Sequence, residues 1–191
     1  MVMQPHTRET WIDAAYARFN LGGLGSIKVE ALSRDLYASK GSFYWHFKDR
    51  QDLINAVMER WEEQATGSII WSVEQEGDPF DRLVTLYTEV GERIYERGGE
   101  RTLYSEAEAE GVMPIVARVT QRRIDYVTTV LRDLGVDQPE ERAAMAVGSV
   151  IGLQQLVTGG WEPLSGESLT RAMIAMSMAP ALPPSGNPSV A

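Results

Sequence analysis

The chain has 191 residues, a formal net charge of −9 and no cysteine, so disulfides and thiolate metal sites are excluded. Its length suits one large or two small domains, and a hydrophobic content of 43% is enough to form a substantial core. The two histidines, His6 and His46, are too distant in sequence to match a metal-ligand spacing, and we expect no metal and no cofactor.

We expect a cytoplasmic protein that makes no membrane contact. No apolar run reaches the roughly 18 residues that a membrane-spanning helix needs. The segment 7–19 is amphipathic and charged, unlike the apolar region of a secretory signal.

The negative charge is unevenly distributed along the chain. Residues 1–60 contain eight Lys/Arg and seven Asp/Glu, a net of +1, whereas residues 61–191 contain 10 Lys/Arg and 20 Asp/Glu, a net of −10. The acidic part would repel DNA and the first part would not. This asymmetry is a modest indication of an interaction surface near the N-terminus.

Four helices are predicted in the first 66 residues, because apolar residues recur there at helical spacing. The predicted ranges are 7–20, 27–36, 39–47 and 49–66. Thr7, Ser26 and Ser39 are the predicted N-caps of the first three. A glycine-rich stretch ends the first helix, and Tyr37 begins a tight turn between the second and third. Trp11 and Trp61 fall on inward faces and are predicted to be core.

Beyond residue 66 the helical pattern continues in longer segments. Proline at the first position of a helix and glycine after its end mark several boundaries. The predicted ranges are 78–97, 101–110, 114–134, 139–158 and 168–178. The proline-rich segment 180–191 has too few apolar residues to fold and is predicted to be disordered. No strand pattern of useful length occurs, so the predicted fold class is all-α.

Residues 39–47, Ser-Lys-Gly-Ser-Phe-Tyr-Trp-His-Phe, indicate function more than any other segment. They place hydroxyl, cationic and imidazole groups on one short helix, and such groups contact DNA phosphates and base edges. Gly41 would let the backbone come close, while Phe43 and Phe47 would anchor the helix in a small core. Two short helices joined by a tight turn form a helix-turn-helix, here about residues 28–47, whose second helix enters the major groove.

This segment, followed by Leu53 near the start of a long helix, resembles the TetR family of transcriptional regulators. The resemblance covers residues 7–60 in motif and the remainder in layout only. Three positions differ from the usual pattern. Tyr37 replaces a glycine in the turn, Lys28 replaces a threonine at the start of the second helix, and Ser33 replaces an alanine within it.

The resemblance implies an N-terminal three-helix helix-turn-helix DNA-binding domain, residues 5–65, and a larger C-terminal helical domain for ligand binding and dimerisation, residues 66–179. It also implies a homodimer that binds a palindromic double-stranded operator, by default as a repressor, and that a small-molecule effector releases. An effector that favours a wider spacing of the two recognition helices would weaken binding without touching DNA.

Nine residues are expected to contact the operator. They are Lys28, Ser39, Lys40, Gly41, Ser42, Tyr44, Trp45, His46 and Lys48. Each has an alternative role. The lysines could be solvated side chains, Ser39 and Ser42 helix caps, and His46 a cap at the helix C-terminus. Tyr44 could be a core-edge residue, Trp45 could pack against the first helix, and Gly41 could reflect a weak demand for helix.

The larger domain offers candidates for an effector pocket among its aromatic and soft side chains. They are Trp71, Tyr87, Tyr95, Tyr104, Met113, Tyr126 and Trp161. Ordinary core packing is the alternative for each. The acidic run 105–110 would either attract a cationic ligand or form a solvated helix face.

A stripe of small residues predicts the dimer interface. Ala144, Gly148 and Gly152 recur at every fourth position of one helix, and each glycine inside a helix costs roughly 1 kcal/mol relative to alanine. Close approach of another helix explains that cost, either within the chain or across a two-fold axis. The predicted interface residues are Ala144, Gly148, Ile151, Gly152 and Met173.

Two other function classes compete with a regulator. An enzyme is disfavoured, because the chain lacks cysteine, a Gly-x-Ser-x-Gly motif and a phosphate loop. An all-helical small-molecule-binding or adaptor protein without DNA contact is favoured slightly by the net charge. Salt-dependent binding to duplex DNA would separate a regulator from an adaptor.

Overall fold

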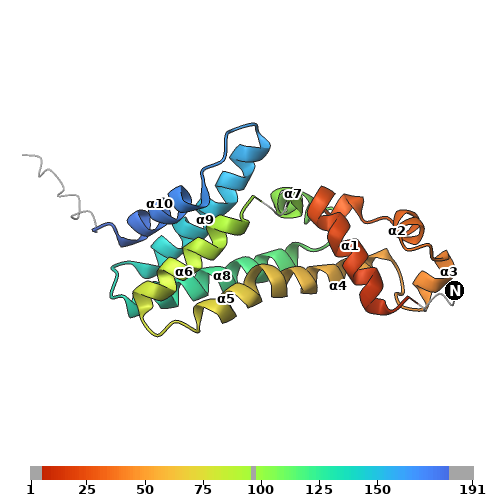
Figure 1. Cartoon of the computed structure of the whole chain (residues 1–191), viewed down its shortest axis with the longest axis horizontal. Helices are drawn as coiled ribbons and strands as arrows, with labels where there is room; N and C mark the ends of the chain where they lie inside the picture. The colour runs from red at the N-terminus through yellow and green to blue at the C-terminus, as the bar shows by residue number, and fades with distance from the viewer. Residues whose placement is uncertain (1–5, 96–97, 181–191) are drawn as a thin grey trace, which may run out of the picture.

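The computed structural model describes residues 6–95 and 98–180, and these residues form helices and turns without any strand. The all-α prediction is therefore confirmed for this part of the chain. The segment 180–191 was predicted to be disordered, and its residues from 181 onward lie outside the described range. Figure 1 shows an elongated molecule with a small group of helices, α1 to α3, at one end and longer helices at the other.

The small end, here called the head, is formed by α1 (Arg8–Gly22), α2 (Val29–Asp35), α3 (Lys40–Tyr44) and the start of α4 (Arg50–Glu62). Thr7 and Ser39 cap α1 and α3 as predicted, through their side-chain oxygens. Ser26 was predicted to cap α2, and this is wrong. Its hydroxyl donates to the carbonyls of Arg18 and Gly23, so it fixes the turn between α1 and α2.

The turn between α2 and α3 closes as a Schellman motif around Tyr37. The Ala38 N–H donates to Ser33 O at 2.8 Å and the Tyr37 N–H to Arg34 O at 3.2 Å, which satisfies two of the last carbonyls of α2. Tyr37 takes a φ of +52°, in the left-handed region that normally favours glycine. Its ring is 87% exposed, so side-chain packing does not offset the backbone strain.

The fourth predicted helix continues well past its predicted end at Thr66. A π-helical turn, Glu63–Gly67, joins α4 to α5 (Ser68–Val73) without a break, which makes one helical run of residues 50–73. Small and polar residues in the turn resemble a helix end in sequence. A π turn instead absorbs one extra residue while the helix goes on. The predicted domain boundary at 65/66 falls inside this turn.

The larger part of the molecule is here called the body. It consists of the second half of the residue 50–73 run, which includes α5, and of five further helices. They are α6 (Pro79–Arg93), α7 (Gly98–Glu106), α8 (Met113–Asp133), α9 (Pro139–Thr158) and α10 (Gly166–Met178). The starts predicted from Asp78-Pro79 and Pro139 are confirmed, since proline occupies the first turn of both helices.

The helix α7 begins and ends earlier than the predicted range 101–110. It begins at Gly98, where glycines were expected to end the previous helix, because α7 starts directly against the end of α1. A Cβ on Gly99 would lie 2.1 Å from Phe19 O, so only glycine permits this approach. It ends at Glu106, and Gly111 takes a left-handed φ of +67° in the following turn.

Two hydrophobic cores are present, and the first crosses from head to body. Trp11, Phe19 and Phe43 of the head and Trp61 near the end of α4 pack in one cluster with α7 and the first turns of α8. The body residues of this cluster are Leu103, Ala107, Val112, Val116 and Val119. The second core lies between α5, α6, α8, α9 and α10. Trp11 and Trp61 are 0% and 1% exposed, which confirms their predicted place in the core.

Replacing Tyr37 by glycine is expected to stabilise the protein. A left-handed backbone costs a residue with a Cβ about 1–2 kcal/mol, and Tyr37→Gly removes this cost. Glycine has greater conformational freedom in the unfolded chain, which cancels part of the gain in stability. We expect the free energy of unfolding in urea to rise by about 0.5–1 kcal/mol. Tyr37→Ala removes the same ring but keeps Cβ. An equal gain in that control would contradict the backbone explanation.

Candidate nucleic-acid interface and internal cavity

Two buried phenylalanines anchor α3 in the core, so that its opposite face is exposed. Phe43 and Phe47 are 0% and 2% exposed, and their rings stack with centroids 5.4 Å apart. Tyr44 and Trp45 point the other way and are 62% and 87% exposed. Trp45 therefore does not pack against α1.

All nine residues predicted to contact DNA lie on the exposed end of the head. Ser39, Lys40, Gly41, Tyr44, Trp45 and Lys48 are exposed, as is Lys28 before α2, and Ser42 and His46 are partly exposed. The Ser39 hydroxyl accepts from the Ser42 N–H at 3.1 Å, so its first role is capping. A Cβ on Gly41 would meet only Ser39 Oγ, at 3.6 Å. Packing within the chain thus does not require glycine there.

The three lysines of this surface differ in their partners. Lys40 Nζ lies 2.7 Å from Glu30 Oε1 in an exposed ion pair, and the hydrogen bond that Lys40 donates to Glu30 raises the pKa of Lys40. Lys28 and Lys48 have no ion pair with any residue in the described ranges. These two ammonium groups are free to meet an incoming anion, whereas Lys40 must first exchange Glu30.

Polar contacts fasten the head to the loop that follows α7. The Arg50 guanidinium donates to both carboxylate oxygens of Glu110, from Nη1 at 2.6 Å and from Nη2 at 3.2 Å. It also donates to the carbonyls of Ile27 and Leu24, at 2.7 and 2.9 Å. The Leu24 N–H donates to Glu106 at 2.7 Å. Glu106 and Glu110 of the acidic run therefore bind the head, and only Glu108 of its three glutamates is exposed.

The body contains a cavity of about 100 Å³, partly open to solvent, that is lined by the π turn and by six helices, α5 to α10. This is small beside the roughly 300–1,000 Å³ of sites for drug-sized ligands. Most of its wall is aliphatic: Ile69, Ile70, Leu86, Val90, Val127, Val147, Val150, Ile151 and Met173. Its polar lining consists of Thr66, Arg93, Glu100, Arg123 and Gln154, together with the two tyrosines Tyr87 and Tyr126.

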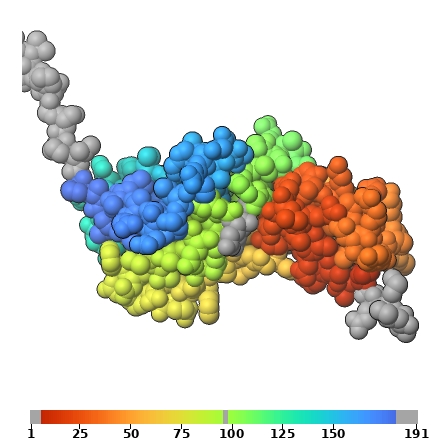
Figure 2. All heavy atoms as spheres, turned by 45° about the horizontal axis from the view of Figure 1, so that its top comes forward, coloured from red at the N-terminus to blue at the C-terminus, as the bar shows by residue number. Residues whose placement is uncertain are grey.

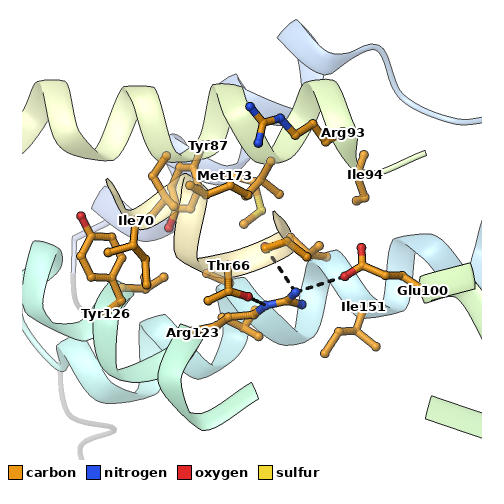
Figure 3. Close-up of a pocket in the computed structure, with 18 of the residues that line it drawn as sticks. Thr66, Ile70, Tyr87, Arg93, Ile94, Glu100, Arg123, Tyr126, Ile151 and Met173 are labelled. Carbon is orange, nitrogen blue, oxygen red and sulfur yellow. Dashed lines mark hydrogen bonds and ion pairs between the residues drawn. The ribbon is translucent and has the colours of Figure 1, made fainter. Parts of the chain in front are cut away.

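Arg123 organises one end of this cavity (Figure 3). Its Nε donates to Thr66 Oγ1 at 2.8 Å, and its Nη2 lies 3.1 Å from Glu100 Oε1. The same Glu100 oxygen accepts from Trp61 Nε1 at 2.5 Å, and the guanidinium carbon lies 5.1 Å from the centroid of the Trp61 ring. Trp61 belongs to α4 and to the head core, so the cavity wall contacts the helix that leads to the head.

Two of the seven residues predicted to line a pocket line this cavity, Tyr87 and Tyr126. Both hydroxyls point to partners, Ser177 and Glu74, and burial raises the pKa of each phenol. The other five do not line this cavity. Trp71, Met113 and Trp161 are 70%, 40% and 43% exposed, Tyr104 packs against the head core, and Tyr95 packs against the body core without lining the cavity.

The predicted interface residues divide into two groups. Ala144, Gly148 and Gly152 lie on the outer face of α9, and a Cβ on either glycine would meet no atom within 4 Å. Close packing within the chain therefore does not explain these glycines. Met173 is 4% exposed and lines the cavity, and Ile151 is partly buried at its edge. The assignment of Met173 to a surface interface is wrong, because its side chain is in the core.

The polar end of the cavity was not predicted from the sequence. Glu100, Arg123 and Gln154 come from three helices and are brought together only by the packing of α7, α8 and α9. A charged residue on an otherwise apolar helix face was the available signal, and Arg123 shows it between Val119 and Val127. Within the described residues, no group of acidic and histidine side chains could hold a metal ion, and no helix is long and apolar enough to cross a bilayer.

Removing Arg50 is expected to destabilise the junction of head and body. Arg50→Met leaves Glu110, whose side chain is 19% exposed, without its charged partner and frees two carbonyls, so the free energy of unfolding should fall by about 2–3 kcal/mol. In a Glu110→Gln background the same substitution should cost less, because the two side chains are coupled.

Arg34→Ala, on the exposed surface of α2, is the matched control and should change stability by no more than about 0.5 kcal/mol. Urea denaturation measures all four variants. Equal losses for Arg50 and Arg34 would show that the Arg50 contacts contribute nothing.

Comparison with known proteins agrees with the arrangement of the head. Residues 12–57 match the profile of the family described as "Bacterial regulatory proteins, tetR family". The HTH-type transcriptional regulator AcrR of Shigella flexneri is 26% identical over 115 residues, 58% of this chain and 54% of that protein. The chain thus spans about half the length of this curated relative.

Solved structures share the fold over nearly the whole chain. A TetR-family transcriptional regulator from Agrobacterium tumefaciens superposes with a TM-score of 0.74 at 20% identity, over 91% of this chain and 100% of its own. AibR, solved in complex with isovaleryl coenzyme A and operator DNA, gives a TM-score of 0.66 at 15% identity over 91% and 99%. The helix-turn-helix head thus matches the TetR family of bacterial regulatory proteins in sequence, and the whole chain matches solved TetR-family regulators in fold.

Proposed function

We propose that the protein is a transcriptional repressor that binds a palindromic operator as a cytoplasmic homodimer and is released by a small molecule. The observation that carries this proposal is the outer surface of α3. It presents an exposed tyrosine, an exposed tryptophan at its end and a glycine, Gly41, that internal packing does not require. Lys28 and Lys48, which form no ion pair with the described residues, flank the helix-turn-helix. These features match a surface that approaches a polyanion closely.

Operator contact in this proposal divides between phosphates and bases. Lys28 and Lys48 flank the helix-turn-helix and meet phosphates, while residues of α3 face the major groove. Gly41 and Ser42 lie on the first turns of α3, where a recognition helix comes nearest to base edges. Lys40 joins the phosphate contacts once it leaves Glu30.

The outer face of α9 is the proposed dimer surface. Ala144, Gly148 and Gly152 allow a second helix to approach closely, and the exposed side chains of Met145 and Leu156 add apolar area. Figure 2 shows α9 and α10 at the surface of the body, away from the head. A two-fold axis there would leave both copies of α3 free to reach successive major grooves, about 34–36 Å apart.

Release by an effector follows from the contact between cavity and head. A ligand in the cavity touches Glu100 and Arg123, which hold Trp61 of α4. Such a ligand weakens DNA binding only if it prefers a body in which the heads are placed differently. A coupling of about 1–3 kcal/mol would give roughly 5–150-fold weaker binding. AibR, a structural relative solved with both isovaleryl coenzyme A and operator DNA, supports this proposal by analogy.

Selection from random DNA duplexes tests the function even though the operator sequence is not known. The protein is incubated at low salt with a random duplex pool, and bound sequences are recovered over several rounds. A repressor of this kind should enrich one palindrome. Recovery of unenriched sequence, or of no DNA, would contradict the proposal and favour a helical ligand-binding protein that makes no DNA contact.

Lys48→Ala is expected to weaken binding to all duplexes by a similar factor. Loss of one phosphate contact should lower the slope of log affinity against log salt by about one. The control is Arg171→Ala, an exposed cation on α10 far from α3. Fluorescence anisotropy over a series of salt concentrations measures both slopes, and an unaltered slope for Lys48→Ala would remove it from the interface.

Gly148→Glu is expected to dissociate the dimer. It places a bulky anion on each side of the two-fold axis, whereas within one chain its Cβ has open space around it. Sedimentation equilibrium should therefore show monomers with unchanged helicity, and operator affinity should fall steeply. Gly25→Glu, in an equally open position of the head, controls for added charge. A dimer that survives Gly148→Glu would move the interface elsewhere.

A further inference from the structure

The charged side chains that line the body cavity neutralise one another. Arg123 pairs with Glu100, and Arg93 pairs with Glu89 beside the cavity. The Arg123 and Glu100 side chains are 21% and 11% exposed, so solvent screens this pair poorly. The cavity therefore presents polar groups at one end without a net charge.

Hydrogen-bonding capacity remains at the same end. Arg123 uses Nε on Thr66 and Nη2 on Ala65 O and Glu100 Oε1, and its Nη1 has no acceptor among residues 6–95 and 98–180. Glu100 Oε1 accepts from both Trp61 and Arg123. No donor from these same ranges reaches Glu100 Oε2. One donor and one acceptor are thus left on neighbouring side chains.

The balance of charge decides which ligand fits. A carboxylate placed on Arg123 would face Glu100, and an ammonium placed on Glu100 would face Arg123. Each ion would also lose its hydration in a site with no net charge to replace it. A neutral group that carries a donor beside an acceptor satisfies both free positions and loses little hydration. Its hydrogen bonds are also stronger than neutral ones, because both partners are charged.

We propose that the cavity binds a small amphipathic molecule with a neutral donor–acceptor head, of the primary carboxamide type, and an aliphatic tail. The head accepts from Arg123 Nη1 and donates to Glu100 Oε2. The tail lies among the branched side chains of Ile69, Val127 and Val150. This inference rests on the proposed function for its regulatory meaning, but binding of the ligand does not require DNA.

Four probes with the same six-carbon acyl or alkyl chain test the proposal: hexanamide, methyl hexanoate, hexanoate and hexylammonium. Hexanamide both donates and accepts, the ester only accepts, and the other two are ions. Calorimetric titration of the wild-type protein at neutral pH should show hexanamide binding about tenfold or more tighter than each of the others. Tightest binding by hexanoate or hexylammonium, or no binding of hexanamide at its solubility limit, would overturn the proposal.

Glu100→Gln supplies a second, directional test. It leaves Arg123 without a counter-charge, so the preference should turn toward the anion, with hexanoate binding about tenfold tighter than to wild type. Glu108→Gln removes an equal charge from an exposed position of the same region and should leave the ranking unchanged. If Glu100→Gln bound hexanoate no better than the control does, the Arg123–Glu100 pair would not be the recognition element.

The ligand test and the DNA test fail separately. Titration of the four probes needs no duplex, and selection of an operator needs no ligand. Should the variant Glu100→Gln lose its fold by circular dichroism, the wild-type ranking alone still decides the proposal. Weaker operator binding in the presence of hexanamide would show that occupation of the cavity regulates DNA binding. Unchanged operator binding would show that hexanamide binds without regulatory effect.

Discussion

The shared core between head and body is the constraint on which the rest of this structure depends. Phe19, Phe43 and Trp61 pack in one cluster with Leu103 of α7 and Val116 of α8, so the helix-turn-helix is not an independently packed unit. Gly99 brings α7 against the last carbonyls of α1, and Arg50 ties the turn after α1 to Glu110. In Figure 2 the residues of α7 directly adjoin those of α1. Because protein interiors are close-packed, a displacement of α7 moves the surface of α3 as well.

The cavity lies at the other end of this connection. Glu100 is on α7 and accepts from Trp61 of α4, so a ligand that contacts Glu100 acts directly on two helices that carry the head. The π turn Glu63–Gly67 lies in the helical run between the two cores and supplies cavity residues, Ala65 and Thr66. Such turns have a less regular hydrogen-bond pattern than an α-helix and often lie at functional sites. In our account this turn is where the helix shared by head and body adjusts.

Local signals in the sequence predicted much of the head. Capping residues, glycines and apolar residues at helical spacing predicted the helices and the two phenylalanine anchors, since these depend on neighbours within a few residues. The prediction failed where the role of a residue depends on a contact with a residue outside its own helix. Ser26 bonds backward to Arg18 instead of capping, Gly99 opens a helix because of Phe19, and Met173 enters the core. The cavity lining required the packing of six helices and the π turn, which no local pattern encodes, and so Arg123 was not recognised from the sequence.

Native-state hydrogen exchange tests the shared core most directly. Amides in one cooperative unit exchange with a common free energy of opening. If the head depends on α7 and α8 as described, amides in the buried turns of α1, α4, α7 and the first half of α8 should share one opening free energy and one denaturant dependence. Opening of α1 to α3 at a clearly lower free energy, with α7 still protected, would show that the head folds on its own and would contradict the account.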